Sequence, residues 1–249
     1  LIMHIFISKT SHLLLFIILT QSIFLSYCYA QEAQQNLSDN SILIINSYTE
    51  SSQWSNEFIN PIYDQYGINN QTDIYIEHMN MLTIDTEEVL EEYKKNLHQR
   101  YGNITPKLII LLGNSAWALM NKEIEKDWKG VPVLLCSEKD YIGNPSTYLT
   151  KELIPVSDRK TLKDYQGNIH LTVFDAHFYI KETIELMTTI TPQMSKLIFL
   201  SDKRCISAQC REEVDSIIAS SHPNIQVEHL IAGDIANDKL ISYLKTCLL

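Results

Sequence analysis

The chain has 249 residues, of which 45% are hydrophobic and 20% are charged, and its net charge at neutral pH is -10. A chain of this length and composition can form one large globular domain or two smaller lobes. An acidic surface repels phosphate backbones, and no cluster of Lys and Arg offsets the charge, so we expect no nucleic-acid partner.

Residues 1–30 have the layout of an export signal. A weakly basic start with Lys9 leads into the largely apolar residues 13–25, and Cys28 and Ala30 supply the small residues of a cleavage site. The apolar stretch is also near the lower limit for crossing a bilayer, about 17 residues. We therefore predict a signal peptide or a membrane anchor, and both place the rest of the chain in the periplasm or on the extracellular face of the membrane.

After a polar linker at residues 31–40, predicted strands and helices alternate. Continuous apolar runs indicate buried strands, and alternating apolar residues, as at 73–77, also indicate a strand, whereas apolar residues three or four apart indicate helices. Strands are expected at 42–45, 73–77, 108–112 and 131–136, and helices at 54–66, 85–100 and 116–126. Pro61 is expected to kink or split the first helix. Because this alternation implies right-handed crossovers, residues 41–150 are predicted to form an N-terminal α/β lobe with a parallel sheet.

The alternation breaks at residues 138–167, which we interpret as a loop that leads into a second lobe. Strands are then expected at 169–173, 196–200 and 225–231, and helices at 176–190, 207–220 and 235–246. This second series ends on a helix with no strand after it, so residues 151–249 are predicted to form a truncated C-terminal α/β lobe. The predicted fold class is α/β, with two Rossmann-like lobes on parallel sheets and the second lobe incomplete.

Polar and aromatic residues gather where the predicted strands end. Ligands of open parallel sheets bind beyond the carboxyl ends of the strands, so we expect a small-molecule ligand there. The candidate ligand-binding residues are Ser47, Tyr48, Trp54, Asn114, Ser115, Ser137, Asp175 and Asp202. Helix capping would also explain Ser47, Ser115 and Asp202, and Trp54 would also suit a core position on an apolar helical face.

Sequence motifs for catalysis, cofactors and metals are missing. The sequence has no G-x-S-x-G elbow, no G-x-x-x-x-G-K-[ST] loop and no G-x-G-x-x-G. Cys136, Cys205, Cys210 and Cys247 follow the leader without C-x-x-C or H-x-x-x-H spacing, which favours isolated thiols over a zinc site. We expect no catalytic residue, no metal and no cofactor; an exported hydrolase is the minority alternative.

Three segments carry a family resemblance. They are the strand with Asn46-Ser47-Tyr48 and then Trp54, the strand-Gly-x-Ser-Ala segment at 108–116, and Thr191-Pro192 followed by the strand 196–200 and Ser201-Asp202. In this order they resemble the type I periplasmic-binding-protein-like domain related to ABC transporter substrate-binding proteins, over about residues 41–246. Such domains occur as free solute-binding proteins and as extracellular sensor regions of membrane histidine kinases, including those of Bacteroidetes.

The resemblance implies a function. The ligand, which would be a sugar, an amino acid or a small aromatic molecule, would bind between the lobes, and lobe closure would be the signal. It favours the sensor module of a two-component histidine kinase, with a membrane-embedded kinase as partner. The alternative is a free-standing periplasmic solute-binding protein that serves the permease of an ABC transporter. The chain has no H-box or ATP-binding segment, so any kinase core of a full-length parent would lie beyond Leu249.

Overall fold

A computed structural model describes residues 40–68, 72–165 and 167–247. The predicted signal peptide or anchor, and nearly all of the predicted linker, lie outside these described residues. Among the helices of the described ranges, none is both long and apolar enough to cross a bilayer.

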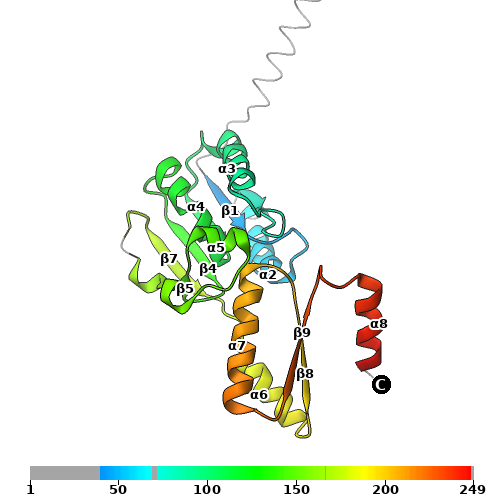
Figure 1. The fold of residues 1–249 in the computed structure, drawn as a ribbon. Coiled ribbons are helices and arrows are strands. Elements are labelled where there is room, and N and C mark those ends of the chain that lie inside the picture. The colour runs from blue at the N-terminus through cyan, green and yellow to red at the C-terminus, as the bar shows by residue number, and fades with distance from the viewer. Residues whose placement is uncertain (1–39, 69–71, 166, 248–249) are drawn as a thin grey trace, which may run out of the picture. The chain divides into compact units, whose positions relative to one another are not determined.

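The described residues form a five-stranded parallel sheet (Figure 1). Its strands are β1 (Ser41–Asn46), β2 (Asp73–His78), β3 (Leu108–Leu112), β4 (Val133–Ser137) and β7 (Leu171–Asp175). They lie in the order β2-β1-β3-β4-β7, and every neighbouring pair is parallel. The α/β class with a parallel sheet is confirmed. Strand order reverses direction between β1 and β3, and such a switch point creates a crevice at the carboxyl ends of the strands.

Helices connect the first four strands of this sheet. They are α2 (Gln53–Ile62), which continues as the π-helical segment Tyr63–Ile68, α3 (Glu87–Tyr101) and α4 (Asn114–Asp127). The α-helical geometry of α2 ends one residue after Pro61, in agreement with the predicted break. Helix α3 begins after Thr86, whose hydroxyl accepts a hydrogen bond from the Val89 N–H at 3.3 Å. Glu87 and Glu88 in its first turn suit the positive end of the helix dipole.

Hydrophobic clusters cover both faces of this sheet in the described part of the chain. Leu43 and Ile45 of β1 pack in the cluster that includes α3 and α4, whereas Ile42 and Ile44 pack in the cluster that includes α2. Burying an aliphatic side chain of this kind contributes about 1.5–3 kcal/mol. Because both faces of β1 are covered, its sequence is a continuous apolar run instead of an alternating one.

Residues 138–167 are more structured than the predicted loop. They contain α5 (Pro145–Thr150), the antiparallel pair β5 (Tyr141–Ile142) and β6 (Lys160–Thr161), and 3-10 turns at Val156–Asp158 and Leu162–Asp164. Two-residue strands and helices of one or two turns are too short to produce a periodic pattern, so they cannot be recognised from the sequence.

Strand β7 pairs differently from the prediction. We expected the strand near residues 169–173 to open the second lobe, but β7 is the edge strand of the first sheet and places Asp175 opposite Ser137 of β4. That prediction is wrong because an alternating apolar pattern such as that of residues 169–173 identifies a strand without identifying its partner. The second series of elements therefore begins after β7.

The second series consists of α6 (Ile180–Ile190), β8 (Lys196–Ser201), α7 (Cys205–Ser221), β9 (Gln226–Ile231) and α8 (Asn237–Cys247). Strands β8 and β9 pair in parallel (Figure 1). Ile184 of α6, Leu197 of β8, and Val214 and Ile218 of α7 form a separate hydrophobic cluster. The predicted helices and strands after residue 180 are thus present, with shifts of a few residues at their ends.

Candidate ligand-binding cleft

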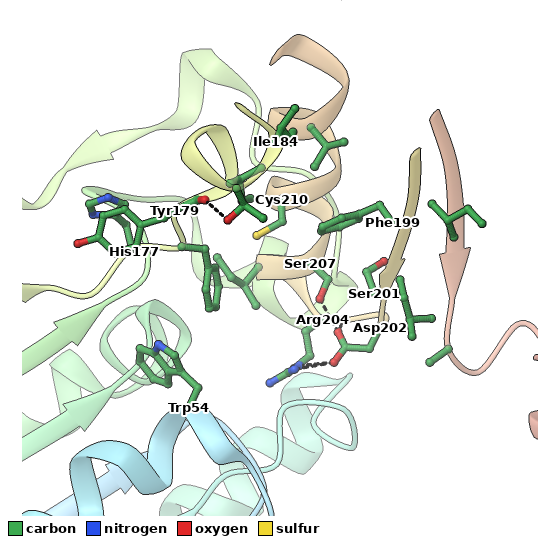
Figure 2. A pocket seen from close by; sticks show the side chains of 18 of the residues that line it. Trp54, His177, Tyr179, Ile184, Phe199, Ser201, Asp202, Arg204, Ser207 and Cys210 are labelled. Carbon is green, nitrogen blue, oxygen red and sulfur yellow. Dashed lines mark hydrogen bonds and ion pairs between the residues drawn. The ribbon is translucent and has the colours of Figure 1, made fainter. Parts of the chain in front are cut away.

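A cleft of about 910 Å³, here called the main cleft, lies at the carboxyl ends of β1 and β8 (Figure 2). Tyr48, from the connection between β1 and α2, and Trp54, in the first turn of α2, form one wall. The other wall comes from the elements α6, β8 and α7 and includes Ile184, Met187, Phe199, Ser201, Asp202 and Arg204. Small-molecule sites typically have volumes of about 300–1,000 Å³, so the main cleft is of ligand size.

Trp54 of the first wall lies among three other aromatic rings. The centre of the Trp54 ring lies 5.1 Å from that of Tyr48, 5.0 Å from that of Phe58 and 6.4 Å from that of Phe178. Aromatic pairs attract one another at such separations. Phe178 belongs to the segment between β7 and α6, so its contact with Trp54 connects the first sheet to the start of the second series.

A hydrogen-bonded polar cluster lies at the end of β8. Asp202 accepts hydrogen bonds from the backbone N–H of Arg204 at 2.9 Å, from Nε of Arg204 at 2.7 Å and from Oγ of Ser207 at 2.6 Å, and Nη2 of Arg204 lies 2.6 Å away. Burial alone would raise the pKa of Asp202, but these hydrogen bonds outweigh it and lower the pKa below its ordinary value. Asp202 is therefore ionised at neutral pH and already paired.

Arg204 also contacts a buried Tyr48–Glu138 pair. Its guanidinium carbon lies 4.3 Å from the centre of the Tyr48 ring, a cation–π geometry. The Tyr48 hydroxyl donates to Oε1 of Glu138 at 2.5 Å, and the Asn114 N–H, at the start of α4, donates to Oε2 at 2.6 Å.

The electrostatics of this pair follow from its burial. Glu138 is 2% exposed, and this burial raises the pKa of its carboxyl group, although the hydrogen bonds from Tyr48 and Asn114 and the charge of Arg204 act in the opposite direction. Burial, and then the nearby Glu138 carboxylate, raise the pKa of the Tyr48 hydroxyl. Tyr48 therefore remains a hydrogen-bond donor at neutral pH.

The turn from β3 into α4 requires glycine. Gly113 has a φ of +94°, and a Cβ atom there would lie 2.8 Å from Oε1 of Glu138 and 2.8 Å from Oγ of Ser47. Oγ of Ser47 accepts a hydrogen bond from the Ala116 N–H at 2.9 Å. The absence of a side chain at Gly113 thus allows two oxygen-bearing side chains to reach the positive end of α4.

Four of the eight predicted ligand-binding residues lie at the main cleft or beside it. Tyr48, Trp54 and Asp202 line it. Ser47 lines an adjoining cavity of about 200 Å³ that shares Tyr48 and Asp202 with the main cleft. The capping alternative also applies to Ser47, at α4, and to Asp202, which accepts the Arg204 N–H just before α7.

The other four predicted residues lie elsewhere. Ser137 and Asp175 line a second cleft of about 820 Å³ beyond the ends of β4 and β7. Asn114 and Ser115 border a cavity of about 10 Å³, which has room for about one water. The Asn114 amide bonds to main-chain groups within residues 138–141, so we interpret Asn114 as a residue that positions this connection.

The sequence analysis missed both charged partners of Tyr48 and the α6 wall. Arg204 lies two residues after Asp202, close to a predicted strand end, and this position was an available signal. The burial of Glu138 has no signal in the sequence, because a Glu is normally exposed. Ile184 and Met187 of α6 follow the apolar pattern of a core-facing helix, and the pattern does not reveal that they also border a cleft.

Three cysteines of the described residues are free thiols. Cys136, Cys205 and Cys210 are buried and form no disulfide. Cys210 lines the main cleft, and burial raises its pKa to about 11, so it is a poor nucleophile at neutral pH. In the part of the chain that the structure describes, no group of three or more His, Cys, Asp or Glu side chains is placed to hold a metal ion.

The chain was compared with known proteins by sequence and by structure, and several solved structures are similar to it. No family model and no curated protein matches the sequence. An ABC domain from Streptococcus pneumonia in complex with L-Trp is 16% identical, with a TM-score of 0.46 over 78% of this chain and 58% of that chain. A Caulobacter myo-inositol binding protein is 10% identical, with a TM-score of 0.48 over 78% and 55%. A putative LacI transcriptional regulator from Bacteroides fragilis is 8% identical, with a TM-score of 0.47 over 82% and 63%. The chain therefore spans between 55% and 63% of the length of these similar structures.

Proposed function

We propose that this chain is a non-catalytic module that binds a small molecule in the main cleft. The observation that carries the proposal is the position and size of this cleft, about 910 Å³ at the carboxyl ends of β1 and β8. Ligands of open α/β sheets bind at such strand ends. A molecule in the cleft contacts Tyr48 and Trp54 on one wall and α6, β8 and α7 on the other, so its binding energy depends on how the walls are arranged.

The biological role we propose is that of an extracytoplasmic sensor module of a two-component histidine kinase. The resemblance of the Ser47-Tyr48, 108–116 and 191–202 segments to such sensor domains supports this role, and the export-signal layout of residues 1–30 supports a location outside the cytoplasm. Ligand binding would favour one arrangement of the walls and pass that preference to a membrane-embedded kinase. The alternative is a free-standing solute-binding protein that delivers the ligand to a permease.

Ligand binding is tested by thermal denaturation of the full chain against a library of sugars, amino acids and small aromatic molecules. A ligand present at 100 times its Kd adds about 2.7 kcal/mol of stability, which raises the melting temperature measurably. Met187→Lys places a charge in the cleft wall, whereas the adjacent Leu186 is 59% exposed and does not line the cleft. Ligands should stabilise the Leu186→Lys variant and fail to stabilise Met187→Lys. No stabilising compound, or equal stabilisation of both variants, would contradict the proposal.

The sensor role is tested separately, through the genetic context and the response of cells. A kinase core encoded in frame with this chain, together with ligand-dependent transcription that is lost on deletion of the locus, is the expected result. Adjacent permease and ATPase genes, with uptake of labelled ligand that is lost on deletion, would favour the transporter alternative.

A further inference from the structure

Several polar side chains that border the main cleft already have hydrogen-bond partners within the protein. Asp202 accepts hydrogen bonds from Arg204 and Ser207. Oγ of Ser201 accepts a hydrogen bond from Nη1 of Arg211 at 2.8 Å, and Oγ1 of Thr183 donates to the main-chain oxygen of Tyr179 at 2.6 Å. Recognition of a sugar requires several polar groups that converge on its hydroxyls, and these groups already bind other groups of the protein.

The charges where Arg204 meets Tyr48 are neutralised as well. The Arg204 guanidinium is paired with Asp202 and lies over the Tyr48 ring, whose hydroxyl donates to the buried Glu138. A ligand carboxylate would have to compete with Asp202 for Arg204 while lying near the Glu138 carboxyl group. Glu57, the remaining acidic residue that lines this cleft, is exposed. An ammonium group that does not reach Glu57 would therefore have no free carboxylate partner in the cleft, and burying an unpaired charge is strongly unfavourable.

The remaining surface of the cleft is aromatic and aliphatic. Trp54 and Phe199 face it from opposite walls, as Figure 2 shows, and Ile184 and Met187 add aliphatic surface from α6. Apolar surface of this kind gains about 25 cal/mol for each Å² that a ligand covers. Most of the binding energy available to a ligand in this cleft therefore comes from its apolar surface.

We infer that the main cleft selects an uncharged, aromatic or otherwise apolar small molecule, and rejects sugars and amino acids. This inference rests on the proposed function, because it names the class of ligand for the same cleft. Selectivity has two physical sources: aromatic stacking against Trp54, and the cost of leaving a charged or hydroxyl-rich group without a partner.

The test is calorimetric titration of the full chain with molecules that share a ring system and differ in charge. Indole is neutral, indole-3-acetate is anionic, tryptamine is cationic and L-tryptophan carries both charges; glucose represents the sugars. Indole should bind, and each charged analogue should bind about tenfold more weakly or worse. Glucose should not bind. The same neutral and charged derivatives of any compound that stabilises the chain in the library screen should follow the same order.

Two variants test whether indole binds in the main cleft, and the outcomes distinguish failure of this inference from failure of the proposed function. Met187→Lys should abolish indole binding, whereas Met187→Leu, which keeps the wall apolar, should retain it within about threefold. Tighter binding of L-tryptophan, indole-3-acetate or glucose that Met187→Lys abolishes would overturn the inference and leave the proposed function intact. If neither the indoles nor any library compound binds, both the inference and the proposed function fail.

Discussion

Glu138 is a carboxyl group that the fold buries and then surrounds with donors. Its oxygens accept hydrogen bonds from the Tyr48 hydroxyl and from the Asn114 N–H at the start of α4. Two separate parts of the chain therefore converge on one acidic side chain. Hydrogen bonds to a carboxyl group compensate only part of the cost of burying its charge, and the net effect here is a raised pKa.

This raised pKa predicts how stability depends on pH. Below the ordinary value of 4.5 the carboxyl group is protonated in both the folded and the unfolded chain. As the pH rises from there through the raised folded pKa, the unfolded chain loses this proton first, so the folded state loses stability. The Glu138→Gln variant keeps oxygen and shape but does not titrate. The free energy of unfolding of the natural chain, measured in urea, should therefore fall relative to Glu138→Gln as the pH rises toward neutral.

A surface substitution supplies the control for this measurement. Glu92 lies exposed on α3, and Glu92→Gln should leave the pH profile of the natural chain unchanged. Parallel pH profiles for the natural chain and Glu138→Gln would contradict the prediction.

The sequence could predict part of the site at this scale. Tyr48, Trp54 and Asp202 were found because they follow or precede apolar runs, and strand ends of parallel sheets are where ligands bind. The roles of Glu138 and Arg204 could not be predicted, because each depends on a partner from a distant part of the chain. Their contacts with Tyr48 span 90 and 156 positions of sequence, and no local pattern encodes them.

At the scale of elements, the β3–α4 turn depends on the absence of a side chain at Gly113. A methyl group at this position would collide with the side chains of Ser47 and Glu138, and an L-residue would also be strained at a φ of +94°. Gly130 provides a comparison, because its φ is +86° but nothing lies within 4 Å of its would-be Cβ.

The two glycines predict different losses of stability. Gly130→Ala should lower the free energy of unfolding by about 1 kcal/mol, through backbone strain alone. Gly113→Ala should cost about 2–4 kcal/mol, because the displaced Ser47 and Glu138 side chains add to the strain. Urea denaturation of both variants measures the difference, and equal losses would show that the contacts at Gly113 carry no energetic weight.

Elements were easier to predict than the pairing between them. β1 and β3 are buried on both faces, so each is an apolar run that the sequence shows directly. β7 has an equally recognisable sequence, yet its assignment to the second series was wrong. Its actual neighbour β4 is set by the short elements α5, β5 and β6 between them, which give no periodic signal.

At the scale of the molecule, α7 belongs to both parts of the fold. Its first residue, Cys205, packs in the cluster of the first sheet, whereas Val214 and Ile218 pack with β8. Ion pairs from Lys139 to Glu213 and from Arg159 to Glu212 hold the same helix to the segment after β4, and Tyr141 donates to Gln209 at 3.2 Å. A helix shared in this way couples the stability of one cluster to that of the other.

This coupling predicts one cooperative unfolding transition for the two parts. Amide hydrogen exchange measured by mass spectrometry in increasing urea should give the same opening free energy for peptides from β3 and from β8. Reversing the charges with Glu212→Lys and Glu213→Lys should lower the value for β8 below that for β3. Reversal at the exposed Glu182 of α6 should lower neither. Two distinct opening free energies in the natural chain would show that α7 does not couple the parts.

The distribution of the tryptophans gives the molecule a built-in optical reporter. Trp117 and Trp128 are 1% and 2% exposed in the core of the first sheet, so their emission is fixed by surroundings that no ligand reaches. Trp54 is half-buried on the wall of the main cleft, between Tyr48 and Phe58. The tryptophan fluorescence of the chain therefore has two components. Trp117 and Trp128 supply a constant background, and the emission of Trp54 changes when a ligand fills the cleft. Ligand occupancy of the main cleft could be followed in real time by this fluorescence, without attaching a dye.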